Sequence, residues 1–180
     1  CEHVHLPVQS GSTTTLRRML RRYGREGYLD CVARLRAAIP GLSVTTDIIV
    51  GFPGETDAEF EETLSLTREV GFDDAFTFKF SPREGTPATR MPAELTVPPA
   101  VVDARYEALL QVVRGISRAR NFARLGERRE VLVEKAARKG GNLLQARSRA
   151  FSTVMVPAAV ANIGDYLTVA DTVPTPVPGR

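Results

Sequence analysis

The sequence has little cysteine and no long apolar run, and these two absences exclude several classes of protein. Its only cysteines are Cys1 and Cys31, too few for a disulfide framework or for a cluster built from the cysteines of this chain. No apolar run approaches the roughly 20 residues that a helix needs to cross a bilayer. The first residues, CEHVHLPVQ, lack the layout of a signal peptide, so we expect a cytoplasmic protein without a membrane partner.

The modest net charge of +3 conceals an uneven distribution of charge along the chain. Residues 55–74 carry eight acidic side chains and one arginine, whereas residues 112–150 carry eleven Lys or Arg and three Glu. A local excess of positive charge indicates a polyanionic partner such as a nucleic acid. A solvated basic face is the alternative interpretation.

The first hundred residues alternate between strand and helix patterns. The expected order is strand 3–9, helix 13–23, helix 26–38, strand 43–50, a helix that begins at the capping box Thr56–Glu59, and strand 75–81. Crossovers of this length join parallel strands, so the fold class is α/β with a parallel sheet. Three strands are too few to close a barrel, and residues 1–95 therefore look like an incomplete domain.

A different pattern follows residue 97. A long basic helix is predicted from Pro98 to about Phe122. Four short alternating segments come next, at residues 129–135, 142–147, 153–156 and 166–170. They predict a small all-β module, in the form of a barrel of the kind that binds oligonucleotides. The proline-rich tail, residues 174–180, is expected to be flexible.

One carboxylate, Asp47, stands inside an apolar strand directly before the loop GFPGET. On a strand buried on both faces, it requires a charged or hydrogen-bonding partner. Alternation places it on the same face as Thr45 and Ile49. Two interpretations stay open: a contact with a ligand hydroxyl, or an internal pair with a cation such as Lys79 on the next strand.

The loops after the three strands favour a ligand site. Ligands of parallel α/β folds bind at the carboxyl ends of the strands, and here these ends carry the loops 9–12, 51–56 and 81–88. The alternative is that such loops are generally polar and glycine-rich. GFPGET lacks the Lys-Ser/Thr pair of a phosphate-binding loop, which excludes nucleoside triphosphate binding there.

Other reactive side chains have simpler interpretations. Cys1, His3 and His5 alternate and could share one strand face, but no fourth metal ligand is evident, so two hydrogen-bonded histidines lining a barrel are favoured. Cys31, among apolar helical neighbours, is interpreted as an inert thiol. One of the pairs Arg17-Arg18 and Arg21-Arg22 could hold a ligand carboxylate.

Four stretches together resemble a known family. HVHLPVQSGS, the M-x-R-x-Y of residues 19–23, TDIIVGFPGET and FTFKFSPREGTPA resemble the methylthiotransferase branch of the radical S-adenosylmethionine (SAM) enzymes, collinearly from residue 3 to about 90. The resemblance implies the C-terminal half of a radical SAM α/β barrel at 1–97 and a connecting basic helix at 98–125. Residues 126–173 resemble the RNA-binding TRAM domain, a small β barrel.

Within the family, the motifs look like the branch that adds a methylthio group to C2 of N-isopentenyladenosine next to the anticodon of tRNA. The threonylcarbamoyladenosine branch shares QSGS and Asp47 but tends to differ around residues 78–82. The branch that modifies a ribosomal protein usually has His where this chain has Ser10. An alternative of another class is a non-enzymatic RNA-binding protein that keeps a half-barrel as scaffold.

The resemblance also implies cofactors and sites. The implied cofactors are SAM and two 4Fe–4S clusters. The CxxxCxxC motif is absent, so the cluster ligands are expected outside this chain. The chain alone is therefore expected to be inactive, and no catalytic residue is assigned. The expected partner is the tRNA anticodon stem-loop, while the sulfur and electron donors are not identified. The implied cofactor pocket comprises Gln9, Ser10, Arg21, Asp47, Val50, Phe80 and Ser81. The expected RNA contacts are Arg114, Arg118, Arg128, Lys135, Arg138, Lys139, Arg147 and Arg149.

Overall fold

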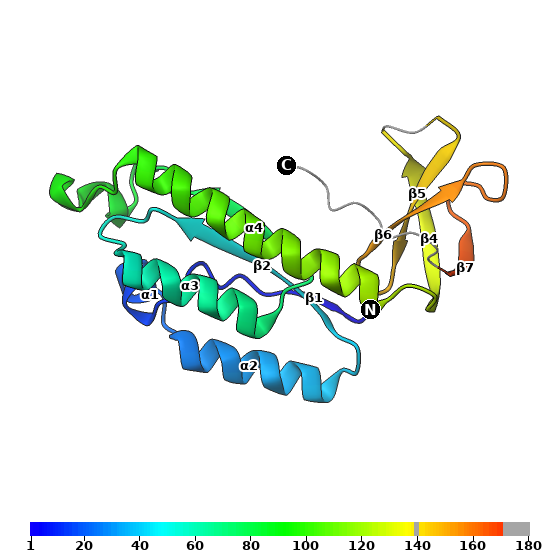
Figure 1. Ribbon diagram of the computed structural model, residues 1–180, viewed down its shortest axis with the longest axis horizontal. Helices are drawn as coiled ribbons and strands as arrows, with labels where there is room; N and C mark the ends of the chain where they lie inside the picture. The colour runs from blue at the N-terminus through cyan, green and yellow to red at the C-terminus, as the bar shows by residue number, and fades with distance from the viewer. Residues whose placement is uncertain (139–140, 171–180) are drawn as a thin grey trace.

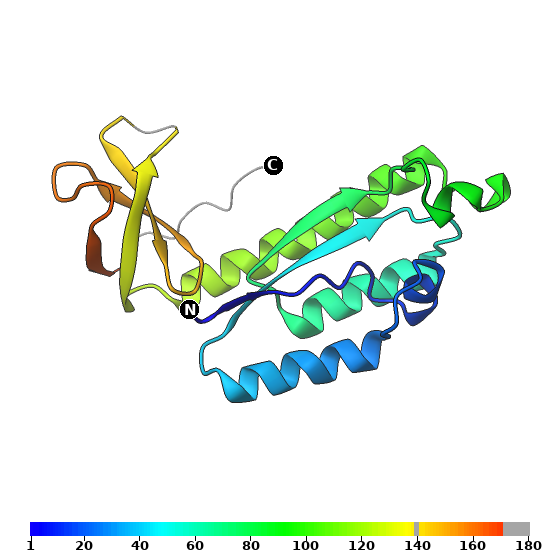
Figure 2. The ribbon, with the colours of Figure 1, turned by 180° about the vertical axis from the view of Figure 1, so that it is seen from behind.

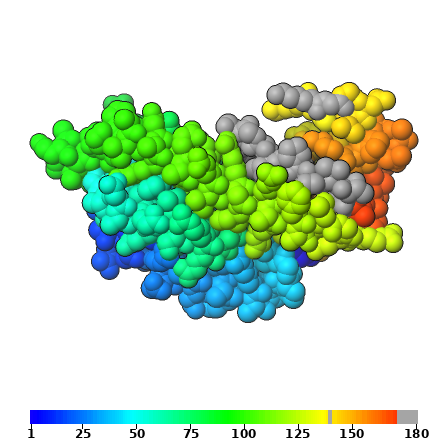
Figure 3. Space-filling model, in the orientation of Figure 1, coloured from blue at the N-terminus to red at the C-terminus, as the bar shows by residue number. Residues whose placement is uncertain are grey.

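A parallel sheet and an antiparallel sheet occupy the two ends of an elongated molecule, and the helix α4 runs between them (Figures 1 and 3). The computed structural model describes residues 1–138 and 141–170. The first part contains β1 (His3–His5), α1 (Thr13–Arg18), α2 (Arg25–Ala38), β2 (Ser43–Val50), α3 (Asp57–Val70) and β3 (Asp74–Lys79). Two short 3-10 turns, η1 (Pro87–Arg90) and η2 (Ala93–Leu95), precede α4 (Pro99–Ala123). The antiparallel part contains β4 (Arg128–Ala136), β5 (Leu143–Ser148), β6 (Thr153–Pro157) and β7 (Tyr166–Ala170).

The parallel sheet has the strand order β1-β2-β3, and its two faces differ. Helices α2, α3 and α4 lie on one face, where the alternating residues Val44, Ile48 and Val50 of β2 are buried in the main hydrophobic core (Figures 1 and 2). No element of the described chain covers the opposite face, toward which the half-buried Asp47 and Ile49 point. The predicted parallel α/β arrangement is confirmed.

Local sequence signals account for the limits of α3. The Thr56 hydroxyl accepts a hydrogen bond from the Glu59 N–H, and the Glu59 carboxylate accepts one from the Thr56 N–H at 2.8 Å, so the predicted capping box is confirmed. The helix ends at Gly71, which adopts the left-handed conformation with φ 59°.

Two elements are shorter than predicted. The first strand ends at His5, because Pro7 has no N–H to donate and Gln9 takes a positive φ of 69° before its N–H rejoins the sheet at the Asp47 carbonyl. The first helix ends at Arg18, because Leu20 adopts a φ of 58° and the Arg21 N–H donates back to the Leu16 carbonyl. These turns bring Gln9 and Arg21 toward the carboxyl ends of the strands.

The helix α4 agrees with the predicted long basic helix. It buries Leu109 and Val113 against the parallel sheet and α3; of its arginines, Arg114 and Arg118 are exposed, whereas Arg105 is buried. Among the helices of the described residues, none is both long and apolar enough to span a membrane.

The four predicted strands of the C-terminal module are confirmed, whereas the closed barrel is not. The strand order is β6-β5-β4-β7, antiparallel throughout, with a register shift between Val133 and Lys135. Within residues 126–138 and 141–170, β6 and β7 remain the two edges of an open sheet, because four short strands are too few to close upon themselves. We call residues 126–170 the β module. The predicted flexible tail, residues 174–180, lies outside the described residues.

The β module contacts the parallel sheet at the amino ends of its strands. The ring of Phe151 stacks on His3 with centroids 4.5 Å apart, and Arg149 forms an ion pair with Glu2 at 2.9 Å. At the end of α4, Arg124 donates to the Asp73 carboxylate at 2.7 Å. The opposite, carboxyl ends of the strands remain accessible.

Candidate functional site: a cavity at the carboxyl ends of the parallel strands

A cavity of about 680 Å³ lies where the parallel strands end. Each of the three loops expected at this rim contributes to it, and apolar rings line much of its wall, including Phe52 and Phe80, whose centroids are 5.1 Å apart. The volume falls within the range of about 300–1,000 Å³ typical of small-molecule sites. The lining residues are Gln9, Arg18, Met19, Leu20, Arg21, Asp47, Ile49, Phe52, Phe78, Lys79, Phe80, Ser81, Arg83, Thr86, Pro87 and Ala88.

Five of the seven residues expected in a cofactor pocket line this cavity: Gln9, Arg21, Asp47, Phe80 and Ser81. The other two do not. The fully buried hydroxyl of Ser10 lies 3.2 Å from that of Thr63 on α3, and Val50 is fully buried on the helix-covered face of β2. Successive residues of a strand point to opposite faces, so Val50 cannot face the same space as Asp47. A ligand in the cavity would not meet these two side chains.

The partner of Asp47 is a histidine. Its carboxylate lies 3.4 Å from His5 Nε2 and is 29% exposed. The alternative pair with Lys79 is wrong: the register aligns Asp47 with Phe76 and Val50 with Lys79, so Lys79 points to the helix-covered face and binds Asp103 at 2.8 Å. The expectation that β2 is buried on both faces is also wrong, because the face of Asp47 is open.

The two histidines are hydrogen-bonded, as predicted, and both contact the same hydroxyl. Thr45 Oγ1 lies 3.0 Å from His3 Nε2 and 2.9 Å from His5 Nδ1. Burial lowers the pKa of His3, which favours its neutral ring. Among the residues that the structure describes, no group of three or more His, Cys, Asp or Glu could hold a metal. Cys1 is exposed and Cys31 half-buried on α2, so these residues do not fit an iron–sulfur cluster.

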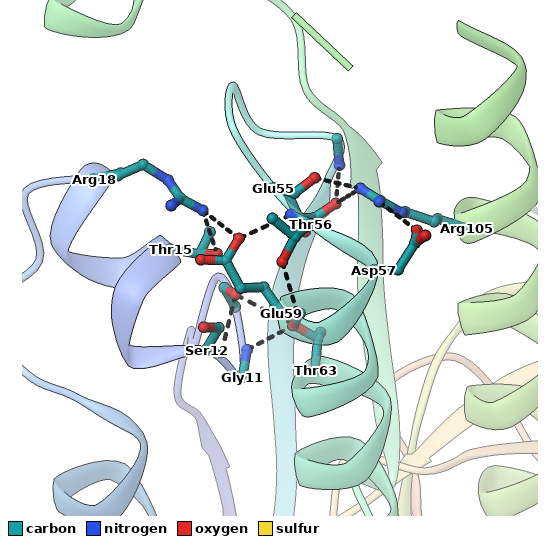
Figure 4. A network of polar contacts seen from close by, with 12 residues as sticks. Gly11, Ser12, Thr15, Arg18, Glu55, Thr56, Asp57, Glu59, Thr63 and Arg105 are labelled. Atoms are coloured by element: carbon teal, nitrogen blue, oxygen red, sulfur yellow. Dashed lines mark hydrogen bonds and ion pairs between the residues drawn. The ribbon is translucent and has the colours of Figure 1, made fainter. Parts of the chain in front are cut away.

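Arginines enter the cavity from two sides. Arg18 donates to the Thr15 hydroxyl and to the Glu59 carboxylate, and the Glu59 carboxylate neutralises its charge (Figure 4). Arg21 is exposed and forms no ion pair within residues 1–138 and 141–170. Sequence reasoning did not single out Arg83, in the loop after β3, although its place in the third rim loop was a usable signal.

A polar network fixes the rim loops to α3 (Figure 4). The Thr63 hydroxyl accepts the Gly11 N–H at 3.0 Å. Only glycine fits here, because a Cβ at Gly11 would lie 2.5 Å from the Glu62 carbonyl oxygen. The first loop is thus held in place before any ligand binds.

Glu55, directly before α3, does not cap that helix. Its side chain is fully buried and accepts the Gly51 N–H at 2.8 Å and the guanidinium of Arg105 at 2.8 Å (Figure 4). Arg105 also binds Asp57 at 2.7 Å. Burial raises the pKa of Glu55, while the Gly51 N–H and Arg105 oppose that shift. Glu55 therefore ties the second loop to α4, while Thr56 and Glu59 form the capping box of α3.

The expected RNA contacts fall into two groups. Arg114, Arg128, Lys135 and Arg138 are exposed, and no ion pair joins them to another described residue. The others have intramolecular contacts: Arg147 binds Glu134 at 2.8 Å and lies over the Phe151 ring, Arg149 binds Glu2, and Arg118 lies over the Phe122 ring. Lys139 lies outside the described residues.

Comparison with known proteins shows which proteins this chain is similar to. Residues 1–67 match the family model of the Radical SAM superfamily. The chain is 50% identical over 157 residues to the tRNA-2-methylthio-N(6)-dimethylallyladenosine synthase of Moorella thermoacetica, covering 87% of this chain and 35% of that protein. It is 47% identical to the synthases of that name from Clostridium botulinum and Bacillus cereus, with 94% and 93% of this chain covered and 37% and 33% of theirs.

A solved structure also matches, more distantly. Coproporphyrinogen III oxidase from Escherichia coli, described as a radical SAM enzyme, overlaps 61% of this chain and 25% of its own with a TM-score of 0.49 and 21% identity.

The family resemblance in the sequence is therefore confirmed. Residues 1–67 carry a segment of the Radical SAM superfamily. Over most of its length, the chain is similar to proteins named tRNA-2-methylthio-N(6)-dimethylallyladenosine synthase. The chain spans about a third of the length of these curated relatives.

Proposed function

We propose that this chain forms the C-terminal part of a radical SAM enzyme that adds a methylthio group to N(6)-dimethylallyladenosine, which is isopentenyladenosine, in tRNA. The observation that carries the proposal is the cavity, which gathers five residues that the family resemblance implied for a cofactor pocket. The half-barrel would be residues 1–97 and the connecting helix 98–125. A tRNA substrate implies a cytoplasmic location.

SAM fits the chemistry of the cavity. Arg21 offers a guanidinium to the methionine carboxylate, and Asp47 offers a carboxylate to a ribose hydroxyl or the ammonium group. The rings of Phe52 and Phe80 offer an apolar wall to the adenine. Bound SAM would supply radical chemistry when reduced by a cluster, and the residues of this chain would bind and orient it.

The two 4Fe–4S clusters of the proposal need ligands outside this chain, because Cys1 and Cys31 are separated and no described cluster of side chains fits them. No step of the chemistry is therefore assigned to residues of this chain, which on its own is proposed to be inactive. The sulfur and electron donors stay unassigned.

The β module is proposed to bind the anticodon stem-loop of tRNA as a TRAM-like unit over residues 126–173. Among the described residues, no ion pair holds the exposed cations Arg128, Lys135 and Arg138, so they can neutralise phosphates without first breaking one. The identity of about 50% to the dimethylallyladenosine synthases favours their substrate over threonylcarbamoyladenosine or a ribosomal protein.

The cofactor site is tested by SAM binding to the complete enzyme. Asp47→Asn should weaken binding about tenfold, the loss of roughly one hydrogen bond to a charged group. The matched control is Asp30→Asn on the exposed face of α2, which should leave the affinity unchanged. Equal affinities for both variants would remove Asp47 from the site.

The RNA site is tested by the salt dependence of tRNA binding. Each of Lys135→Ala and Arg138→Ala should reduce the slope of log K against log salt by about 1. Arg34→Ala, on α2 beside Asp30, is the control. Binding that does not respond to salt would overturn the assignment.

A further inference from the structure

A chain of four polar side chains crosses the open face of the parallel sheet. It runs from His3 at the start of β1, through Thr45, to His5 and then to Asp47 at the cavity. The steps measure 3.0, 2.9 and 3.4 Å. Nothing in the proposed function uses His3, Thr45 or His5.

The chemistry of these groups determines which side chain donates and which accepts in each hydrogen bond. A carboxylate 3.4 Å from His5 Nε2 favours the tautomer with the hydrogen on this nitrogen, and in that neutral ring Nδ1 is an acceptor. The Thr45 hydroxyl has one hydrogen and donates it to His5 Nδ1. Its oxygen must therefore accept from His3 Nε2–H. In this arrangement both histidines are Nε2–H tautomers.

The β module holds the His3 end of this series of polar contacts. The ring of His3 lies nearly parallel to that of Phe151, with 13° between the planes. The Arg147 guanidinium covers Phe151 at 4.2 Å from the ring centroid, and Glu134 holds Arg147 in turn. Phe151 has a φ of 64°, which a phenylalanine adopts at a cost, so tertiary contacts keep this turn in place.

We propose that Thr45 and His5 are positioning residues for Asp47, and that His3, clamped by Phe151, is the anchor of their hydrogen-bond chain. The inference rests on the proposed function in one respect, that the oriented carboxylate meets SAM. A half-exposed carboxylate without partners would rotate freely, whereas one beside a ring of fixed tautomer keeps its orientation. The β module thereby supports the cavity from the other end of the sheet.

The orientation is tested without SAM, by NMR of this chain, which contains only two histidines. Long-range nitrogen–proton spectra should show both rings as Nε2–H tautomers at a pH where both are neutral. Thr45→Val keeps the shape and loses the hydroxyl, so the fixed tautomers should be lost and the Asp47 carboxyl carbon should shift. Thr45→Ser keeps the hydroxyl and should preserve both signals.

A second variant guards against misfolding of Thr45→Val. His5 has a partly exposed side chain, and His5→Asn can keep the contact with Thr45 while removing the nitrogen beside Asp47. It should shift the Asp47 signal and leave the His3 tautomer in place. An Nδ1–H tautomer at His3, or an Asp47 signal that ignores both Thr45→Val and His5→Asn, would overturn the proposal.

The link to the cofactor is measured in the complete enzyme. Thr45→Val should weaken SAM binding about fivefold, and Thr45→Ser should leave it within about twofold. If the NMR signals respond as expected while Asp47→Asn leaves SAM affinity intact, the proposed cofactor contact fails and the positioning chain stands. If Asp47→Asn loses SAM affinity while the NMR signals stay unchanged in both Thr45→Val and His5→Asn, the cofactor contact stands and the positioning proposal fails.

Discussion

The two sheets of this molecule are stabilised differently. The parallel sheet shares a core of fifteen buried apolar residues with three helices, including Phe72, Leu66 and Leu109, whereas the core of the β module comprises six residues, four valines and two alanines. The parallel sheet also carries buried polar pairs such as Glu55–Arg105. Apolar area buried scales with stability. The β module therefore depends more on its contact with His3 than the parallel part depends on the β module.

The rim of the cavity and the surface of the β module also suit different kinds of ligand. The rim of the cavity is held by a network of hydrogen bonds between loops and α3, a preorganised surface suited to a small ligand (Figure 4). In the described part of the β module, the exposed cations Arg128, Lys135 and Arg138 form no ion pair, and such a surface suits a flexible polyanion.

The largest effect is expected at Phe72, whose ring is 1% exposed in the larger core. Phe72→Ala should lower the free energy of unfolding by about 3–5 kcal/mol, because the substitution removes apolar contact and leaves a cavity. Denaturant unfolding followed by circular dichroism measures it. Phe78→Ala, on the open face of the same sheet and 48% exposed, is the control and should cost less than about 1 kcal/mol. Equal costs would contradict the assigned core.

The next effect is expected at the buried pair Glu55–Arg105. Arg105→Met leaves the Glu55 carboxylate buried without its cation, which should lower the free energy of unfolding by about 3 kcal/mol. The double variant Arg105→Met with Glu55→Gln should recover part of that loss, because no buried charge remains. Additive losses in chemical unfolding would show that the two side chains do not act as a pair.

A smaller effect is expected in the β module. Val131→Ala should lower its stability by about 2 kcal/mol, since Val131 is 1% exposed in the smaller core. Hydrogen exchange should accelerate in β4–β7 and change little in α2 and α3, because the two cores are separate. Met155→Ala, an exposed position on β6, is the control. Acceleration throughout the chain would mean that the two parts unfold together.

The smallest effect is the pH dependence of the contact between His3 and the β module. Burial lowers the pKa of His3 below its usual 6.5, so the unfolded chain takes up this proton at a higher pH than the folded chain. The contribution of neutral His3 to folding stability is complete above pH 6.5 and is lost as the pH falls through the lowered pKa of the folded state. Protection of β4–β7 against hydrogen exchange, corrected for intrinsic rates, should therefore fall upon acidification. His3→Gln keeps a polar contact and should remove this part of the pH dependence.

Local patterns determined the elements well because their causes lie within a few residues. The capping box at Thr56 and the αL position of Gly71 are local, and so is the alternation that predicted β2 at its observed limits, Ser43–Val50. Strand order predicted that the three rim loops meet, because parallel strands end at one edge. The family resemblance, not spacing, implied the pocket residues Gln9, Arg21, Asp47, Phe80 and Ser81, which all line the cavity.

Tertiary structure alone decided the partners. Register and strand facing exclude the pair Asp47–Lys79, and the chain through Thr45 joins residues 40 and 42 positions apart. Glu55 meets Arg105 across 50 positions, which no local pattern encodes. Sequence alone thus determined which segments are strands, helices and rim loops, because these follow from periodicity and turn chemistry. Which carboxylate meets which cation was decided by packing, because a one-residue change of facing reverses every contact of a strand.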